Sequence, residues 1–171
     1  MTRRRMKVVV ACTVMISALG VASAVEFAPR LVWNASGSAP IGLYLIEAGV
    51  PEIGDFALVE LGPALEKFIA GRRYLPADIP LLKRVAALPG DEVCRKSEAI
   101  FINEIYVAEA QISDSSGRKL PHWSGCFTLR SSEFFLLNDH EKSLDGRYFG
   151  ATKSEDVIGV AIPLWTKESE G

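Results

Sequence analysis

Short apolar segments separated by turn residues recur along most of this chain, and they constrain its fold more than any other feature. Segments of this length, rich in β-branched and aromatic residues, are typical of strands that bury one face. Turn signals such as Pro89-Gly90-Asp91 and Ser115-Ser116-Gly117 lie between them. The pattern predicts strands over residues 42–47, 56–61, 81–88, 99–102, 105–107, 133–137 and 157–165.

Beyond the N-terminal region one helix is predicted, over residues 63–70, because Pro63 suits a first helical turn and Gly71 suits the position just past the end. The pair Asn103-Glu104 separates two predicted strands and indicates a hairpin, although Asn-Glu is a weaker turn than Asn-Gly. Many short strands at this spacing predict a mainly β, antiparallel domain of the sandwich or barrel-like kind. A length of 171 residues suits one such domain with an added segment.

The N-terminal region combines a basic cluster with an apolar run. Arg3, Arg4, Arg5 and Lys7 precede residues 8–25, which carry no charge. This run approaches the roughly 20 residues that span a bilayer core. The positive-inside rule then keeps the basic end in the cytoplasm. We therefore expect residues 1–25 to be a basic tip and a single transmembrane helix in a bacterial inner membrane, in contact with lipid, and residues 26–171 to be a periplasmic domain.

A removable signal peptide is the alternative for the same segment. Ala22-Ser23-Ala24 resembles a small-x-small cleavage site. The apolar run is longer than the roughly 7–15 residues of a signal-peptide core, which favours a retained anchor. Both interpretations export the folded domain.

The cysteines are relevant to the expected export of the domain. Cys12 lies in the apolar run, whereas Cys94 and Cys126 lie in the domain expected to be exported, where disulfides persist. We expect these two to be bonded, and two buried thiols are the alternative. His122 and His140 are isolated in the sequence, so no metal site is expected.

Composition and charge exclude other classes. Hydrophobic residues make up 49% of the chain, which is enough for a core. The formal net charge is −2, so the chain has no basic excess for binding a nucleic acid backbone.

Residues 80–91 contain a lysine in an otherwise apolar strand. Side chains alternate along a strand, so Lys83 shares a face with Leu81, Val85 and Ala87, and Arg84 lies opposite. Burial in apolar surroundings lowers the pKa of a lysine, and a neutral amine can take a proton from a serine hydroxyl. The alternative is an edge-strand lysine that discourages aggregation.

Two further segments carry polar groups suited to chemistry. Residues 34–44 hold small residues and a proline around Ser38, which lets the backbone turn sharply and present a hydroxyl. Residues 137–150 form a polar stretch in which Asp145 and Arg147 are close enough to pair. Each of these segments alone is common on protein surfaces.

Together and in this order, the three segments resemble the signal peptidase I superfamily. The shared motifs are Ser-x-Pro, then Lys-Arg-Val-x-x-Leu-Pro-Gly-Asp, then Ser-x-Asp-x-Arg-Tyr-x-Gly, and the resemblance runs from Asn34 to Trp165. A narrower resemblance is to conjugative-transfer peptidases of the TraF type. It rests on Ser-x-Pro-x-Gly-Leu-Tyr, on Gly-Arg-x-Leu-Pro at residues 117–121, and on Gly146, where leader peptidases often carry Ser.

The resemblance implies a role for each residue that matches the family motifs. It makes Ser38 the nucleophile and Lys83 the general base. The Ser38 N–H and the Ser36 hydroxyl become the oxyanion-hole donors. The remaining matches are supporting residues that orient the lysine or hold the site by charge pairing: Ser143, Asp145, Arg147 and Arg84. No metal or organic cofactor is implied.

The implied function is a membrane-bound serine endopeptidase that cuts a leader or pro-segment from an exported protein with small residues before the cut. The TraF resemblance points to a conjugative pilin precursor and, on that resemblance alone, to subsequent ring closure. One alternative is a general type I signal peptidase, and another is a non-catalytic, membrane-tethered β-domain of a transfer apparatus. A β-lactamase-type site is excluded, because Ile41 stands where Ser-x-x-Lys requires lysine.

Overall fold

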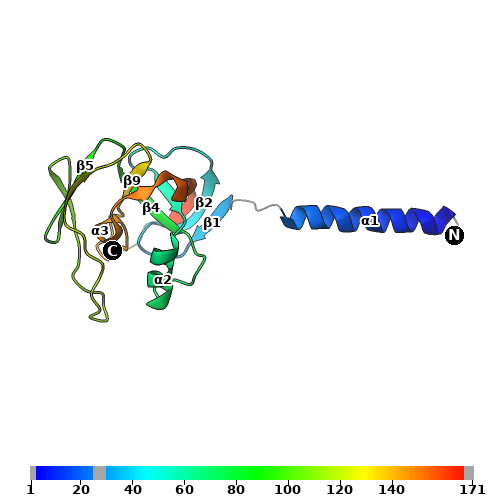
Figure 1. Ribbon diagram of the computed structural model, residues 1–171, viewed down its shortest axis with the longest axis horizontal. Helices are drawn as coiled ribbons and strands as arrows, with labels where there is room; N and C mark the ends of the chain where they lie inside the picture. Colours follow the sequence, from blue (N-terminus) through cyan, green and yellow to red (C-terminus); the bar gives the residue numbers. More distant parts are fainter. Residues whose placement is uncertain (1–2, 25–29, 168–171) are drawn as a thin grey trace.

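The structure, a computed structural model, describes residues 3–24 and 30–167. Figure 1 shows an isolated N-terminal helix and a β-domain built from two sheets. All strand pairs in both sheets are antiparallel, as the strand pattern predicted. The predicted boundary between residues 25 and 26 lies outside the described residues.

The larger sheet has seven strands in the order β1-β2-β11-β3-β4-β9-β10. Its strands are β1 Leu31–Asn34, β2 Ile41–Glu47, β3 Phe56–Val59, β4 Leu81–Ala87, β9 Glu133–Leu136, β10 Thr152–Lys153 and β11 Val157–Lys167. Strand β2 shows the alternation that builds this sheet, because Gly42, Tyr44 and Ile46 are buried while their neighbours are not.

The smaller sheet has four strands in the order β7-β6-β5-β8. These are β5 Glu92–Lys96, β6 Ala99–Ile102, β7 Ile105–Glu109 and β8 Gly125–Thr128. The predicted hairpin joins β6 to β7, and both Asn103 and Glu104 adopt positive φ angles of 48° and 69°. Two successive positive φ angles are what a tight hairpin turn requires.

Three helices and one short 3₁₀ turn complete the described residues. They are α1 Arg3–Ala24, α2 Pro63–Gly71, α3 Gly146–Phe149 and η1 Ser154–Asp156. Helix α2 matches the predicted helix to within one residue, with Pro63 in its first turn.

Helix α1 lies apart from the β-domain in Figure 1, and its side chains are exposed wherever they are described. Among the described residues, no helix reaches the combined length and apolarity needed to cross a membrane. The predicted transmembrane helix is therefore not supported.

The core divides into three apolar clusters that follow the sheets. One cluster packs Tyr44 and Leu58 between β2, β3 and β11. A second joins β4 and β9 to the smaller sheet through Val93, Ile100 and Phe135. The third cluster lies on the face of β3, β4 and β9 that also carries Lys83: Ala57, Val59, Val85, Phe134 and Leu136. The prediction that Lys83 shares its face with Val85 is confirmed. The same prediction was wrong for Ala87, which lies in the second cluster because the register shifts between Val85 and Ala87.

Four strands, β1, β5, β8 and β10, and the helix α3 were not predicted. Strand β5 reads Glu-Val-Cys-Arg-Lys, and its charged residues hide the strand pattern. Strand β1 ends at Asn34, directly before the serine-containing segment, so its position decides where that segment begins.

Candidate active site

Four predicted site residues line one cavity of about 880 Å³. They come from different parts of the chain: Ser36 and Ser38 from the segment after β1, Lys83 from β4, and Ser143 from the loop before α3. Most of the wall is apolar, and side chains such as Leu58, Ile69 and Leu82 contribute to it. A cavity that is mainly apolar with a few converging polar groups is the usual form of a small binding site.

The turn that carries Ser38 is held by the buried side chain of Asn34. Its amide nitrogen donates to the carbonyl oxygens of Ser36, Ala39 and Pro40 at 3.0, 3.1 and 3.0 Å. Its amide oxygen accepts from the N–H of Ser36 at 3.1 Å. The Tyr44 hydroxyl also donates to the Pro40 carbonyl, at 2.6 Å. These bonds fix the backbone on both sides of Ser38.

The two serine hydroxyls of this turn lie 3.0 Å apart, oxygen to oxygen. The Ser36 hydroxyl also accepts from the backbone N–H of Ser38 at 3.3 Å. Ser36 therefore lies beside the N–H that was predicted to be an oxyanion-hole donor. Ser38 is half-buried and Ser36 is exposed.

Lys83 is buried, with 5% of its surface exposed, on β4, an interior strand of the larger sheet. Its ammonium nitrogen donates to the Ser143 hydroxyl at 2.9 Å. Burial lowers the pKa of Lys83 from 10.5 to about 8, an effect that Asp145 opposes and Arg147 reinforces. A substantial fraction of the amine is therefore neutral near pH 8.

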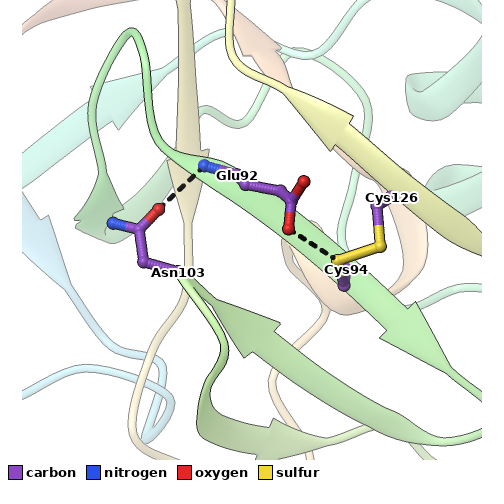
Figure 2. Close-up of a disulfide and its surroundings, with 4 residues drawn as sticks. All are labelled: Glu92, Cys94, Asn103 and Cys126. Carbon is purple, nitrogen blue, oxygen red and sulfur yellow. Dashed lines mark hydrogen bonds between the residues drawn. A yellow bond between two sulfur atoms is a disulfide. The ribbon is translucent and has the colours of Figure 1, made fainter.

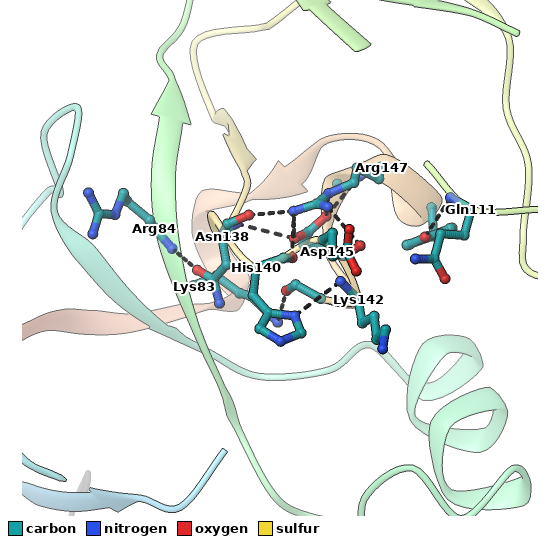
Figure 3. A network of polar contacts seen from close by, with 12 residues as sticks. Lys83, Arg84, Gln111, Asn138, His140, Lys142, Asp145 and Arg147 are labelled. Atoms are coloured by element: carbon teal, nitrogen blue, oxygen red, sulfur yellow. Dashed lines mark hydrogen bonds and ion pairs between the residues drawn. The ribbon is translucent and has the colours of Figure 1, made fainter. Parts of the chain in front are cut away.

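Asp145 and Arg147 form a fully buried ion pair behind Lys83, as predicted (Figure 3). The Nε and terminal nitrogen of Arg147 donate to the two carboxylate oxygens at 3.1 and 3.2 Å. The same guanidinium also donates to the backbone carbonyls of Asn138, His140 and Glu141. Because each buried charge has several partners, the pair can hold the loop before α3 in one conformation.

Asn138 connects this loop to the strand that carries Lys83 (Figure 3). Its amide oxygen accepts from the Arg84 N–H at 2.8 Å, and its amide nitrogen donates to the Leu82 carbonyl at 3.2 Å. Its own N–H donates to Asp145 at 3.2 Å. Asn138 therefore fixes the peptide groups on both sides of Lys83.

Arg84 lies on the other face of β4. Its guanidinium is 3.5 Å from Asp139 and lies over the Phe56 ring, 4.9 Å from the centroid. Asp139 is largely exposed, so this pair is solvated and contributes little energy. Arg84 pairs by charge as predicted, but with a partner outside the Asp145–Arg147 pair.

Gly146 is required by close packing behind the site. A Cβ atom there would lie 2.6 Å from the Phe135 ring and 2.8 Å from the Leu136 carbonyl oxygen. Helix α3 can thus approach β9 only with glycine at this position. The Trp123 indole N–H donates to the Gly146 carbonyl at 3.0 Å and adds a further contact.

One wall of the cavity comes from residues 110–121, which lie between β7 and β8. We call these residues the strap. The N–H of Gln111 donates to the Tyr148 hydroxyl at 2.9 Å, which attaches the strap to α3. The Tyr74 hydroxyl donates to the Asp114 carboxylate, and Arg118 donates to the same carboxylate at 2.7 Å. These hydrogen bonds lower the pKa of Asp114 below its usual value, and the bond from Tyr74 has the largest effect.

The disulfide between Cys94 and Cys126 is present, as predicted, and joins directly opposed residues of β5 and β8 (Figure 2). The Glu92 carboxylate lies 3.5 Å from the Cys94 sulfur. Glu92, Cys94 and Cys126 are also the one group of three potential metal ligands in the described part of the chain. Because both sulfurs are bonded to each other, neither is available as a thiolate ligand.

Sequence reasoning assigned no role to Asn34 or Asn138. Both lie within the motif segments, and asparagine beside a turn is a signal for side chain to backbone bonding. That Asn138 reaches across to β4 depends on the β4–β9 pairing, which the local sequence does not encode.

This mainly β fold, with a buried lysine and a serine turn lining one cavity, is of the signal peptidase class. The family model described as "Signal peptidase, peptidase S26" matches residues 3–165, so the chain belongs to that family.

Within the family, the chain is similar to proteins of conjugal transfer. It is 34% identical over 150 residues to the plasmid transfer protein TraF of Escherichia coli, covering 78% of this chain and 81% of that protein. It is 31% identical over 175 residues to the conjugal transfer protein TraF of Agrobacterium tumefaciens (strain 15955), covering 96% and 97%.

Two further matches are signal peptidase I proteins. The chain is 30% identical to signal peptidase I V of Bacillus subtilis over 94 residues, covering 47% of this chain and 54% of that protein. A solved structure of a signal peptidase I from Enterococcus faecalis is 21% identical, covers 67% of this chain and 98% of the other, and superposes with a TM-score of 0.39.

Proposed function

We propose that this chain is a serine endopeptidase of conjugal transfer that uses Ser38 as nucleophile and Lys83 as general base. The observation that carries the proposal is the buried Lys83, with a pKa of about 8, in the same cavity as the half-buried Ser38. The similarity to TraF proteins supports the place of the enzyme in conjugation.

The first step of the proposed reaction forms an acyl-enzyme. The Ser38 hydroxyl turns from Ser36 toward Lys83, attacks the scissile carbonyl and gives its proton to the neutral amine. The resulting oxyanion accepts hydrogen bonds from the Ser38 N–H and the Ser36 hydroxyl, in place of the contact that those two groups make in the free enzyme. Lysinium then protonates the leaving amine, which departs as the bond to the carbonyl carbon breaks.

The second step releases the acyl group and regenerates Ser38. Neutral Lys83 takes a proton from a water molecule, the hydroxide oxygen attacks the ester, and the proton returns to Ser38. An amine held in the cavity can attack instead and form a new peptide bond. Ser143 accepts one amine hydrogen of Lys83, and this bond orients the lone pair in both steps.

The proposed substrate is an exported pilin precursor with small residues before the cut. The disulfide supports a location outside the cytoplasm, because such bonds persist in oxidising compartments such as the periplasm. A general signal peptidase is the second candidate, and the partial similarity to signal peptidase I V favours it.

The test is a mass-spectrometric assay of a co-expressed candidate propilin with wild type, Ser38→Ala, Lys83→Ala and Ser36→Ala. We expect wild type alone to process the precursor fully and Ser36→Ala to be roughly 10²–10³-fold slower, the usual cost of one oxyanion donor. A product one water lighter than the cut chain reports ring closure, and the mass of the cut chain reports hydrolysis. Normal processing by Ser38→Ala would refute the proposal.

A second arm separates the two candidate functions. A general leader-peptide substrate is offered to the same variants. Cleavage of that substrate and not of the propilin favours a general signal peptidase, and cleavage of the propilin alone favours the specialised enzyme.

A further inference from the structure

The cavity that holds Ser38 is lined by three residues with charged side chains: Lys83, Asp114 and Lys142. The rest of its wall is apolar or carries hydroxyl and amide groups. In surroundings of this kind a single unneutralised charge interacts more strongly with a ligand than it would in bulk water.

Two of the three charges are already compensated. Lys83 is buried, hydrogen bonded to Ser143, and neutral in the form that the proposed reaction requires. The side chain of Asp114 is 9% exposed and accepts from Tyr74, from Arg118 and from the backbone N–H groups of Ser116 and Arg118. Neither residue offers a free charge to a ligand.

Lys142 is different, because its side chain is exposed and has no hydrogen bond or ion pair within residues 3–24 and 30–167. Its backbone N–H donates to the His140 ring at 3.1 Å, which fixes the start of the side chain. The nearby acid Asp139 is already paired with Arg84. Lys142 precedes Ser143, the partner of Lys83, in the chain, and it lines the same cavity as Ser38.

We propose that Lys142 is a specificity-determining residue that makes the cavity select substrates with a carboxylate within a few residues of the scissile bond. The inference rests on the proposed peptidase function for the position of that bond. A carboxylate of an Asp or Glu side chain, or the C-terminal carboxylate of a short released segment, has the charge that complements an unpaired ammonium group. The ion pair would form on binding and exclude substrates with lysine or arginine there.

The experiment uses labelled peptides with Ala-x-Ala before the expected cut, in which one Glu, Gln or Lys is moved through each flanking position. A parallel pair ends in a free carboxylate or an amide, which separates the two carboxylate sources. Binding to full-length Ser38→Ala is measured first, since it needs no catalysis. We expect one position at which Glu, or the free carboxylate, binds about three- to tenfold more tightly than Gln or the amide.

Variants of Lys142 then assign that preference. We expect Lys142→Gln to bind the Glu and Gln peptides equally well, and Lys142→Glu to bind the Lys peptide more tightly than the Glu peptide. Lys67→Gln is the matched control, because Lys67 is an exposed lysine of α2 that does not line the cavity. We expect Lys67→Gln to keep the same preference for Glu over Gln as Ser38→Ala without it.

The outcomes separate this inference from the peptidase proposal. A Glu-to-Gln ratio near one at every position, with no difference between the two C-terminal forms, overturns the role of Lys142. The same conclusion follows if a preference exists but survives Lys142→Gln. Failure of wild type to cleave any peptide that binds counts against the peptidase proposal, while the binding ratios still decide the role of Lys142.

Discussion

Lys83 connects the burial of one side chain to the pH dependence of the proposed reaction. Its pKa of about 8 lies below the ordinary 10.5, mainly because of burial. The reaction needs the neutral amine, which forms as the pH rises through the pKa of the folded enzyme. We therefore expect kcat/KM to rise about tenfold between pH 7 and pH 9 and then to level off.

The measurement is a pH profile of peptide cleavage by wild type. An ionisation with an apparent pKa near 8, on the acid side of the profile, is the expected result. A profile that is flat from pH 7 to pH 9, or that falls as the pH rises, contradicts the role of Lys83 as a base.

Asn138 acts on Lys83 through the backbone and is a positioning residue. Asn138→Ala removes the bonds to Arg84 N–H and Leu82 carbonyl and leaves buried polar groups without partners. We expect the free energy of unfolding to fall by about 1–3 kcal/mol and kcat to fall more than KM changes.

The matched control is Asn103→Ala. Asn103 lies in the β6–β7 hairpin, away from the cavity, and its side chain accepts a hydrogen bond from the backbone N–H of Glu92 (Figure 2). This substitution should affect unfolding without a specific loss of kcat. Equal kinetic effects of the two substitutions would remove Asn138 from the positioning role.

At the scale of elements, the strap closes one side of the cavity and is held by few side chains. Tyr74→Phe deletes the hydroxyl that bonds Asp114 but keeps the ring that packs beside Phe68. We expect the strap to exchange its amide hydrogens faster and KM to rise severalfold with little change in kcat, since Lys83 and Ser38 are not touched.

Hydrogen exchange across residues 110–121 and steady-state kinetics check this prediction. Tyr106→Phe is the control, because Tyr106 is an exposed tyrosine of β7 outside the cavity. Unchanged exchange in the strap of Tyr74→Phe would show that the Tyr74–Asp114 bond does not hold it.

Some elements were predictable from local sequence and others were not. Strand β4 and helix α2 have clear signals, an apolar β-rich run and a proline in the first turn. Strand β5 does not, because its Arg95 is charged and yet buried, with its guanidinium donating to the Arg147 carbonyl at 2.6 Å. Helix α3 is only four residues long and depends on Asp145, which accepts from the Arg147 N–H. Both depend on tertiary partners.

The candidate site divides in the same way. Ser38 and Lys83 were predicted from motifs whose order in the chain is specific, and both line the same cavity. The asparagines Asn34 and Asn138 act by bonding backbone groups across turns and strands. Such bonds follow from strand register, which the sequence specifies only through the complete fold.

For the whole molecule, the disulfide stabilises the domain without forming part of the cavity. It closes a separation of 32 residues between β5 and β8 in the smaller sheet. We expect Cys94→Ala/Cys126→Ala to lower the free energy of unfolding by about 3–4 kcal/mol, because the unfolded chain regains the entropy of that loop.

Urea denaturation of the double variant and of reduced wild type measures this effect. Peptide cleavage at 25 °C should persist in the folded fraction. An unchanged free energy of unfolding would contradict the stabilising role of the disulfide. Loss of cleavage in protein that is still folded would contradict the claim that the disulfide is independent of the site.

In the proposed mechanism, Ser38 and Lys83 act as one catalytic unit. The most direct measurement compares kcat/KM for Ser38→Ala, Lys83→Ala and the double variant on one cleaved peptide. We expect each single variant to lose about 10⁴-fold or more in kcat/KM, and the double variant to be no slower than either, because the effects of residues that act as one unit are strongly non-additive. Losses that multiply in the double variant, or single variants within tenfold of wild type, would contradict it.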